Sequence, residues 1–409
     1  MYKSGQLFDI KQQENAERID KELRHERAGV WYISDSYGSK ILVKLPSSTI
    51  KAIIKGCRFE LLFAIDEDCT PKVLHTGLRI FDDQQNPQLV MNTQRFLRDH
   101  FALLKIMYLE RVQVQFCNEL SAVQTFGDLK LDEWDRHRVL AFLGNPKQMY
   151  VGDFNGRLNR SLDKFQAILN PREDESIEVN MRDLSIIGAY EHLENINHSF
   201  YGGEEPVHTN IGDALEGEQF EKEIFVVLQS LFTDRTYHAP KIKSKSSLRE
   251  LIDIFAISDY GVFLIEAKAL GVYEATDDRT MARKILGLQK QIKKAIGQLV
   301  GASKTIKEGQ GIFDSNNSEI VFDRGLFPHG IVLISEMMHF GDWSSTVQLI
   351  IETMSECKMF IHVMDLQEFL QFIGYSNQDK DIFDSLLMQR AEKFVSNPKL
   401  HVRWEFVGE

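Results

Sequence analysis

The chain has 409 residues and a formal net charge of −12, with 43% apolar and 26% charged residues. This length exceeds what one small core needs, so two domains are expected. The composition is that of a globular protein, and the acidic balance argues against a protein that coats nucleic acid nonspecifically. No apolar run reaches the roughly 18 residues of a membrane span, and the polar N-terminus shows no signal peptide.

The four cysteines (Cys57, Cys69, Cys117 and Cys357) are scattered and form no CxxC pair. This pattern is typical of reduced thiols in an intracellular protein, so a cytoplasmic location is expected. The histidines and cysteines also lack the spacing of a structural zinc site.

Residues 1–195 are expected to form an α+β domain. Hydrophobic periodicity predicts strands at 29–34, 41–45, 59–65, 73–81 and 112–117, and helices at 93–110, 132–143 and within 150–170. No catalytic constellation occurs in this region, which leaves sensing of a substrate feature or subunit assembly as its role. The stretch NINHSFYGGEEPVHTN is rich in Gly and Asn and places the domain boundary before residue 211.

The second domain, residues 211–409, is organised around a predicted hairpin at 248–268, LRELIDIFAISDYGVFLIEAK. Residues 251–257 and 262–268 are expected as strands, and residues 258–261 as the turn between them. With that turn, Ile257 faces Val262, and counting back places Asp253 opposite Glu266. Directly opposed residues share one face with Cβ atoms about 5 Å apart. Lys268 lies two positions beyond Glu266 and shares this face.

The other face of the hairpin is uninterrupted apolar core in this prediction: Ile252, Ile254, Ala256, Phe263, Ile265 and Ala267. On the polar face, two close carboxylates repel each other, and a divalent cation with hard oxygen ligands, Mg²⁺ or Mn²⁺, is the usual remedy. Such an ion activates a bound water, and a nearby lysine can orient that water or steady a phosphate. The alternative is a half-exposed hairpin with ordinary surface charges.

Basic residues flank this hairpin on both sides. Before it stand Lys241, Lys243, Lys245 and Arg249. After it, residues 279–307 contain no Asp or Glu and predict a long helix with one apolar face and a basic outer side that includes Lys290, Lys293 and Lys294. Two basic segments around a carboxylate site suit a polyanion that runs past a metal, whereas a solvated lysine face is the alternative.

The remaining elements complete an alternating pattern. An apolar stripe at 220–231 predicts a helix before the hairpin, with Glu218 and Glu221 on one flank. Strands are expected at 331–335 and 360–364, and helices at 343–354, 366–373 and 381–395. This alternation predicts at least one parallel strand pair, hence an α/β domain with a mixed sheet flanked by helices.

This order of elements resembles the PD-(D/E)xK, or restriction-endonuclease-like, nuclease superfamily. The segments GEQFEKEIFVVLQSL, ELIDIFAI and GVFLIEAKALG are similar to NERD-type nuclease-related domains, with a weaker likeness to the DUF4263 domain of Shedu anti-phage nucleases. The resemblance covers residues 211–395. It implies a restriction-endonuclease-like fold and magnesium-dependent cleavage of phosphodiester bonds.

The resemblance also implies roles for individual residues. Asp253 and Glu266 match the metal-binding acids, the backbone carbonyl of Ala267 would be a further ligand, and Lys268 matches the catalytic lysine. The proline that names the superfamily is absent before Asp253.

Two further positions follow from the neighbouring helices of the family. Glu221 matches the helix-borne acid, with Glu218 as second choice. Gln298, and after it Gln291, matches the glutamine of the helix that follows the hairpin.

The hypothesis is therefore a Mg²⁺- or Mn²⁺-dependent DNA endonuclease of prokaryotic type, with RNA open as a substrate. The resemblance alone suggests defence against phage or foreign DNA and assembly as a homo-oligomer, a dimer or tetramer. The alternative is a catalytically inactive nucleic-acid-binding or scaffold protein on a nuclease fold.

Overall fold

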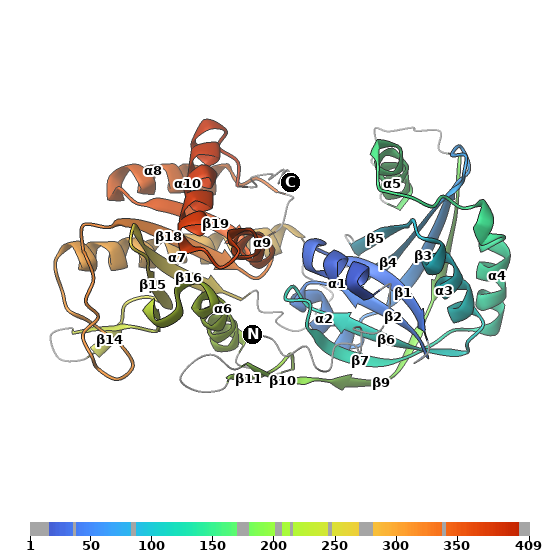
Figure 1. The fold of residues 1–409 in the computed structure, drawn as a ribbon, viewed down its shortest axis with the longest axis horizontal. Coiled ribbons are helices and arrows are strands. Elements are labelled where there is room, and N and C mark those ends of the chain that lie inside the picture. Colours follow the sequence, from blue (N-terminus) through green and yellow to red (C-terminus); the bar gives the residue numbers. More distant parts are fainter. Residues whose placement is uncertain are drawn as a thin grey trace.

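The computed structural model describes residues 16–35, 38–82, 87–169, 180–200, 207–212, 216–243, 248–269, 281–337 and 341–400. Figure 1 shows two lobes that follow one another along the chain. We call α1 to β9 the N-terminal lobe and α6 to α10 the C-terminal lobe; a small antiparallel pair, β10 (Asn197–Phe200) and β11 (Val207–Asn210), lies between them in the chain.

The N-terminal lobe is built around two sheets. Its strands are β1 (Gly29–Asp35), β2 (Gly38–Lys44), β3 (Phe59–Asp66), β4 (Val73–Ile80), β5 (Gln88–Gln94), β6 (Arg111–Cys117), β7 (Val123–Lys130), β8 (Met181–Ile187) and β9 (Ala189–Asn195). Its helices are α1 (Ala16–His25), α2 (Ser47–Ile54), α3 (Leu97–Met107), α4 (Glu133–Leu143) and α5 (Gly156–Leu169).

The two sheets of this lobe share one core. One sheet has the order β1-β2-β6-β7-β9 and the other β5-β4-β3-β8. A single buried cluster joins Val30 and Val114 of the first sheet to Phe63 of the second, and Leu103 of α3 belongs to it too. The branched and aromatic residues that predicted these strands therefore face inward, toward the layer between the sheets.

The C-terminal lobe contains the expected mixed sheet. Its strands are β12 (Thr236–His238), β13 (Lys241–Lys243), β14 (Leu248–Glu250), β15 (Ile254–Ile257), β16 (Gly261–Lys268), β17 (Ile312–Phe313), β18 (Phe327–Ile334) and β19 (Phe360–Asp365). Its helices are α6 (Glu216–Phe232), α7 (Met281–Lys307), α8 (Ser344–Cys357), α9 (Leu366–Ser376) and α10 (Lys380–Ser396).

Five of these strands form the central sheet, in the order β12-β15-β16-β18-β19. The pairs β12–β15 and β15–β16 are antiparallel, whereas β16–β18 and β18–β19 are parallel. The prediction of a parallel pair and of an α/β fold is confirmed. The short strands β14, β13 and β17 form a separate small sheet.

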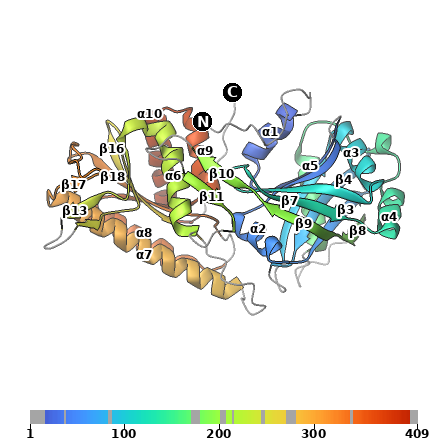
Figure 2. The same cartoon turned by 90° about the horizontal axis from the view of Figure 1, so that it is seen from below.

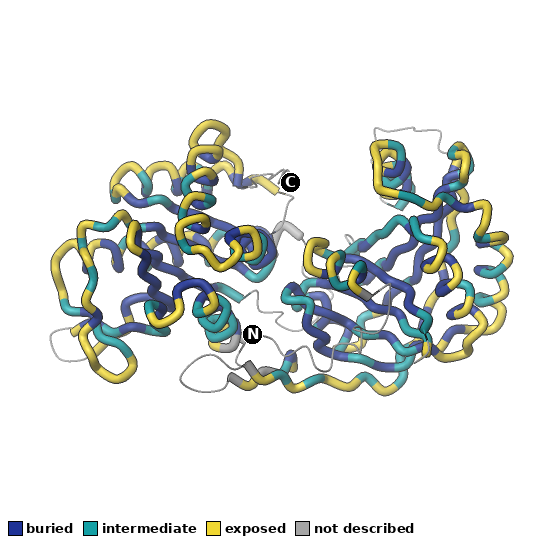
Figure 3. Tube along the Cα trace, in the orientation of Figure 1, coloured by how far each residue is buried: buried dark blue, intermediate teal, exposed yellow. Residues whose placement is uncertain are grey.

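Helices cover both faces of the central sheet. Phe263 and Ile265 pack in one cluster with residues of α6, α9 and α10, whereas Val262 and Leu264 pack in another with residues of α7 and α8. This division follows from the alternation of side chains along a strand. Figure 3 shows the sheet strands of this lobe as buried, with exposed residues on the outer helical surfaces.

Several predicted boundaries were wrong. The helix expected at 93–110 begins at Leu97, because Thr93 and Gln94 end the unpredicted strand β5, which pairs with β4. The helix expected within 150–170 is confirmed, at Gly156–Leu169. Strands β7, β8 and β9 and helices α1 and α2 were not predicted either, and residues 170–179 lie outside the described part.

The lobes contact each other at the carboxyl ends of the parallel strands. Arg27 Nη1 donates to Oδ2 of Asp365, the last residue of β19, at 3.0 Å. Ser48 Oγ, at the start of α2, donates to Oε2 of Glu336, just beyond β18, at 2.8 Å. The N-terminal lobe therefore borders the edge of the sheet at which β16 also ends. No described helix combines the length and apolar character that a membrane span needs.

Candidate active site

The register of the β15–β16 hairpin agrees with the prediction. Ile257 pairs with Val262, and Ile254 pairs with Ile265. The next step of the same register brings Asp253, immediately before β15, beside Glu266 of β16. The apolar reverse face is also found, with Ile254, Ala256, Phe263, Ile265 and Ala267 in one cluster.

Ile252 is the exception on that face. It packs in the opposite cluster with Phe255 and the residues of α7. The strand begins at Ile254, so the side-chain alternation of a strand does not extend back to Ile252.

Lys268 joins the two acids. Its Nζ lies 3.1 Å from Oδ2 of Asp253 and 2.6 Å from Oε2 of Glu266. Asp253 is 4% exposed and Glu266 is fully buried, so both carboxyls depend on the protein for polar partners. In the described part of the chain, Oε1 of Glu266 has no hydrogen-bond partner. The predicted trio is thus brought together around a buried carboxylate oxygen that has no partner among the described residues.

Electrostatics sets the protonation of these groups. Burial and the neighbouring Asp253 raise the pKa of Glu266 to about 7. Burial lowers the pKa of Lys268, but Asp253 and Glu266 more than offset this effect and leave that pKa raised. Lys268 is therefore a cation near neutral pH, and Glu266 changes charge within the physiological range.

The backbone at Ala267 also faces Asp253. Its N–H donates to Oδ2 of Asp253 at 2.8 Å. A strand residue directs its N–H and C=O toward the same side, so the Ala267 carbonyl also points toward Asp253. The next carbonyl, that of Lys268, turns the other way and accepts from Ser335 N at 3.2 Å. Two carboxylates and a carbonyl, all oxygen donors, thus line one side of β16.

Helix α6 distinguishes the two candidate glutamates. Glu221 is half-buried, and burial together with the charge of Asp253 raises its pKa to about 7. The charge of Lys268 lowers this pKa, and the charge of Glu266 raises it further. Glu218 instead forms an exposed ion pair with Lys222 at 2.7 Å, which lowers its pKa. The first choice, Glu221, is the one that interacts electrostatically with the trio.

Two residues at this site were missed by sequence reasoning. Burial and Asp253 raise the pKa of Glu250, the last residue of β14. His238 pairs with Ile254 in the sheet, and its Nε2 is buried without a hydrogen-bond partner among the described residues. Glu250 stands only three residues before Asp253, so proximity in sequence could have indicated it. His238 carries no such signal, because strand pairing alone brings it near Asp253.

The glutamines of α7 are half-buried on one flank of the helix. Neither Gln298 nor Gln291 hydrogen-bonds to Asp253, Glu266 or Lys268 in the described ranges, although the Oε1 atom of each is buried without a partner. Among the described residues the structure therefore shows no hydrogen bond between the predicted glutamine and the trio, and its role stays a prediction.

The basic candidates lie on two elements. Lys290, Lys293 and Lys294 are exposed on α7, and within the described residues none of the three forms an ion pair. Figure 2 shows α7 as a long helix along one side of the C-terminal lobe.

The other basic residues lie on the β13–β14 pair. Lys241 is opposite Glu250 in the register. Lys243 is exposed, with its Nζ 5.0 Å from the centre of the Phe313 ring, and Arg249 is exposed on β14. Lys245 lies outside the described residues.

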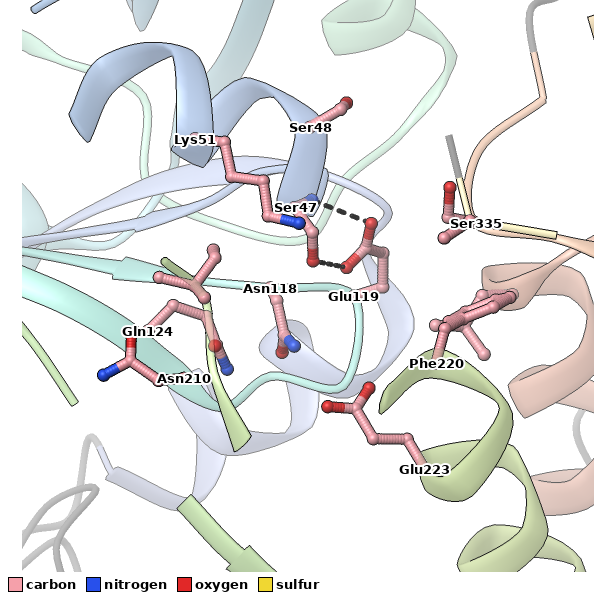
Figure 4. Close-up of a pocket in the computed structure, with 13 residues that line it drawn as sticks. Ser47, Ser48, Lys51, Asn118, Glu119, Gln124, Asn210, Phe220, Glu223 and Ser335 are labelled. Carbon is pink, nitrogen blue, oxygen red and sulfur yellow. Dashed lines mark hydrogen bonds between the residues drawn. The ribbon is translucent and has the colours of Figure 1, made fainter. Parts of the chain in front are cut away.

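A small polar cavity of about 60 Å³ lies between the lobes, next to this site. Its wall includes Phe220, which precedes Glu221, and Ala269, which follows Lys268. Figure 4 shows Ser47 and Glu119 on one side, where the Glu119 carboxylate accepts hydrogen bonds from the Ser47 amide at 2.8 Å and hydroxyl at 2.6 Å. The N-terminal lobe thus forms a polar wall beside the candidate site.

No family model matches the chain, and no curated protein matches it. Among solved structures, the chain is similar to the small subunit of the heterodimeric restriction endonuclease R.BspD6I, at 14% identity and a TM-score of 0.26. This match covers 44% of the chain and 87% of that subunit.

Proposed function

We propose that the chain is a metal-dependent nuclease that hydrolyses phosphodiester bonds of DNA. The observation that carries this proposal is the Lys268 ammonium held between two buried carboxylates, Asp253 and Glu266, at the end of adjacent strands. Buried acids beside a lysine at the ends of sheet strands are suited to chemistry on a phosphate.

The donor set fits a hard divalent cation such as Mg²⁺ or Mn²⁺. Asp253 and Glu266 would supply carboxylate oxygens, including the unpartnered Oε1 of Glu266, and Ala267 its carbonyl. When bound, such an ion lowers the pKa of a water ligand and offsets charge on the phosphate.

The remaining steps belong to side chains of this protein. Lys268 would donate a hydrogen bond to the attacking water or to a phosphate oxygen. Glu221, whose pKa is raised to about 7, would accept a proton near neutral pH. Lys290, Lys293 and Lys294 would contact backbone phosphates along α7. Defence against phage or foreign DNA is the biological role that we propose with this activity, in the cytoplasm of a prokaryote.

A direct assay tests the proposal. Purified protein is incubated with linear and circular DNA and with RNA, in Mg²⁺, in Mn²⁺ and in EDTA, beside the variants Glu266→Ala and Lys268→Ala. We expect cleavage of DNA that needs the divalent ion and that falls by about 10²- to 10³-fold in each variant. Cleavage that persists in EDTA, or in both variants, would contradict the proposal.

One observation favours a second candidate, a nucleic-acid-binding protein without catalytic activity. The Lys268 ammonium already forms ion pairs with both Asp253 and Glu266, so the two carboxylates are held together without a bound cation. Binding of DNA without cleavage under all of these ions would support this alternative.

A further inference from the structure

The Lys268 ammonium holds the two acids of the candidate site together. Its Nζ lies 2.6 Å from Glu266 Oε2 and 3.1 Å from Asp253 Oδ2. The same Asp253 oxygen also accepts from Ala267 N at 2.8 Å, so two donors already approach it. Asp253 is 4% exposed and Glu266 is 0% exposed, and two buried carboxylates need a positive charge beside them. Lys268 therefore gives these acids the neutralisation that a divalent cation would give them in the proposed nuclease.

The ammonium and a divalent cation would share the same oxygens. A Mg²⁺ ion bound to Oε2 of Glu266 would stand about 2.1 Å from that oxygen. Since Nζ is 2.6 Å from the same atom, the ion would lie at most about 5 Å from Nζ. Like charges this close repel strongly where water is excluded. Binding of the cation therefore favours departure of the ammonium.

The side chain of Lys268 can leave while its backbone stays in the sheet. Its four-carbon stem is flexible, and the side chain is 20% exposed, whereas the side chain of Glu266 is buried. In the register, Lys268 pairs with Ile334 of β18, and its carbonyl accepts from Ser335 N at 3.2 Å. These backbone contacts do not involve Nζ, so side-chain torsions alone move the ammonium away from the acids.

An ammonium that leaves two carboxylates needs another anion. In the proposed reaction a phosphate oxygen contacts the cation, which brings the charged phosphate next to Lys268. We infer that the Lys268 ammonium and the divalent cation compete for Asp253 and Glu266, and that the substrate phosphate accepts the ammonium when the cation displaces it. This inference rests on the proposed function and makes binding cooperative, because the cation and the phosphate each raise the affinity for the other.

Mn²⁺ binding to the full chain at pH 8, followed by the EPR signal of the free ion, tests the competition. Lys268→Met, which keeps the length of the side chain but not its charge, should bind Mn²⁺ at least about 10-fold more tightly than the wild type. The matched control is Lys222→Met, which removes a lysine from an ion pair with Glu218 on α6 and should change the affinity by less than about 2-fold. Circular dichroism establishes that both variants are folded.

The outcomes separate this inference from the proposed function. Equal or weaker Mn²⁺ binding by folded Lys268→Met would overturn the competition and leave the proposed cation site in place. Absence of Mn²⁺ binding in every variant and in the wild type would overturn both.

A small phosphodiester tests the second part of the inference. Dimethyl phosphate carries one negative charge, as each DNA phosphate does, and should tighten Mn²⁺ binding several-fold more in the wild type than in Lys268→Met, because only the wild type has an ammonium to transfer. Equal tightening in the two proteins would assign the cooperativity to direct contact between phosphate and cation, and would remove Lys268 from it.

Amine labelling tests the displacement in the wild-type protein itself. While the two carboxylates hold it, Lys268 should react slowly with an acylating reagent in EDTA, and saturating Mn²⁺ should raise its labelling several-fold as the amine becomes accessible. Lys304, whose side chain is 76% exposed on α7, is the internal control and should react equally in both conditions. Mass spectrometry of the labelled peptides measures both residues. Unchanged labelling of Lys268 in saturating Mn²⁺ would contradict the inference.

Discussion

In β16, Nζ of Lys268 lies 2.6 Å from Oε2 of Glu266, only two residues earlier in the chain. Residues two apart in a strand share a face, so this contact follows directly from the strand conformation. The side chain of Glu266 is buried, and among the described residues the Lys268 ammonium favours its charged form. The attraction of the Lys268 ammonium favours the Glu266 carboxylate, whereas burial disfavours it. The balance of these two effects controls both the stability of the protein and ligand binding at the site.

The stability of the protein should depend on the ionisation of Glu266. Its pKa is about 7 in the folded protein against an ordinary value of 4.5, so the folded state binds this proton more tightly than the unfolded state. The stabilisation from that proton is therefore present below about pH 4.5 and is lost as the pH rises to about 7. Glu266→Gln should raise the free energy of unfolding at pH 8 by on the order of 1–3 kcal/mol, and much less at pH 5.

Urea unfolding in EDTA at the two pH values measures this effect. The exposed Glu392→Gln on α10 is the matched control and should change little at either pH. An equal effect of Glu266→Gln at pH 5 and pH 8 would show that its carboxyl is not protonated in the folded protein.

Binding of Mg²⁺ or Mn²⁺ should weaken steeply in acid. Glu221 and Glu266 both have pKa values raised to about 7, and cations bind carboxylates rather than carboxylic acids. Below about pH 7 the affinity for the cation should fall by about 10-fold per pH unit for each proton that the cation displaces. Calorimetry with Mn²⁺ in the absence of DNA measures this dependence.

The variant Glu221→Gln separates the two carboxyls. It should remove one proton from the pH dependence but retain cation binding through Asp253 and Glu266. Loss of all cation binding would show that Glu221 is a principal ligand. An unchanged pH dependence would show that the Glu221 carboxyl does not take part in cation binding.

Affinity for DNA should depend on the exposed lysines of α7. Replacing Lys290, Lys293 and Lys294 with alanine removes three positive charges from one helical side. The slope of log affinity against log salt should become less steep by about 0.9 for each lysine that contacts phosphate. The control removes three exposed charges from the N-terminal lobe: Lys130, Lys147 and Arg160. Equal slopes for the two triple variants would show that α7 is not the contact surface.

The contact between Arg27 and Asp365 should stabilise the protein mainly through the acid. The carboxylate of Asp365 also accepts from Glu368 N at 2.8 Å and so caps α9. Asp365→Ala should lower the free energy of unfolding by about 1–3 kcal/mol, because it removes both the cap and the ion pair. Arg27→Ala removes a half-exposed partner and should cost less than about 1 kcal/mol. Thermal denaturation of both variants compares them; equal losses would assign the stabilisation to the ion pair.

Local patterns were sufficient where the chain folds on itself over a few residues. The hairpin register follows from a short turn between two apolar runs, and Ser258 secures it by accepting hydrogen bonds at Oγ from Tyr260 N and Gly261 N. The Glu-x-Lys pair and the apolar reverse face then follow from alternation. The misplacement of Ile252 shows the limit of this reasoning, since alternation holds only within the strand itself.

Contacts between distant parts of the chain were decided by the tertiary structure. His238 reaches Asp253 only because β12 pairs with β15, and Ser48 reaches Glu336 across 288 residues of sequence. The amino-acid sequence determined the trio of Asp253, Glu266 and Lys268, because turn chemistry and strand periodicity act over neighbouring residues. Packing of the two lobes decided what surrounds that trio, because the free energy of packing depends on surfaces that no local pattern brings together.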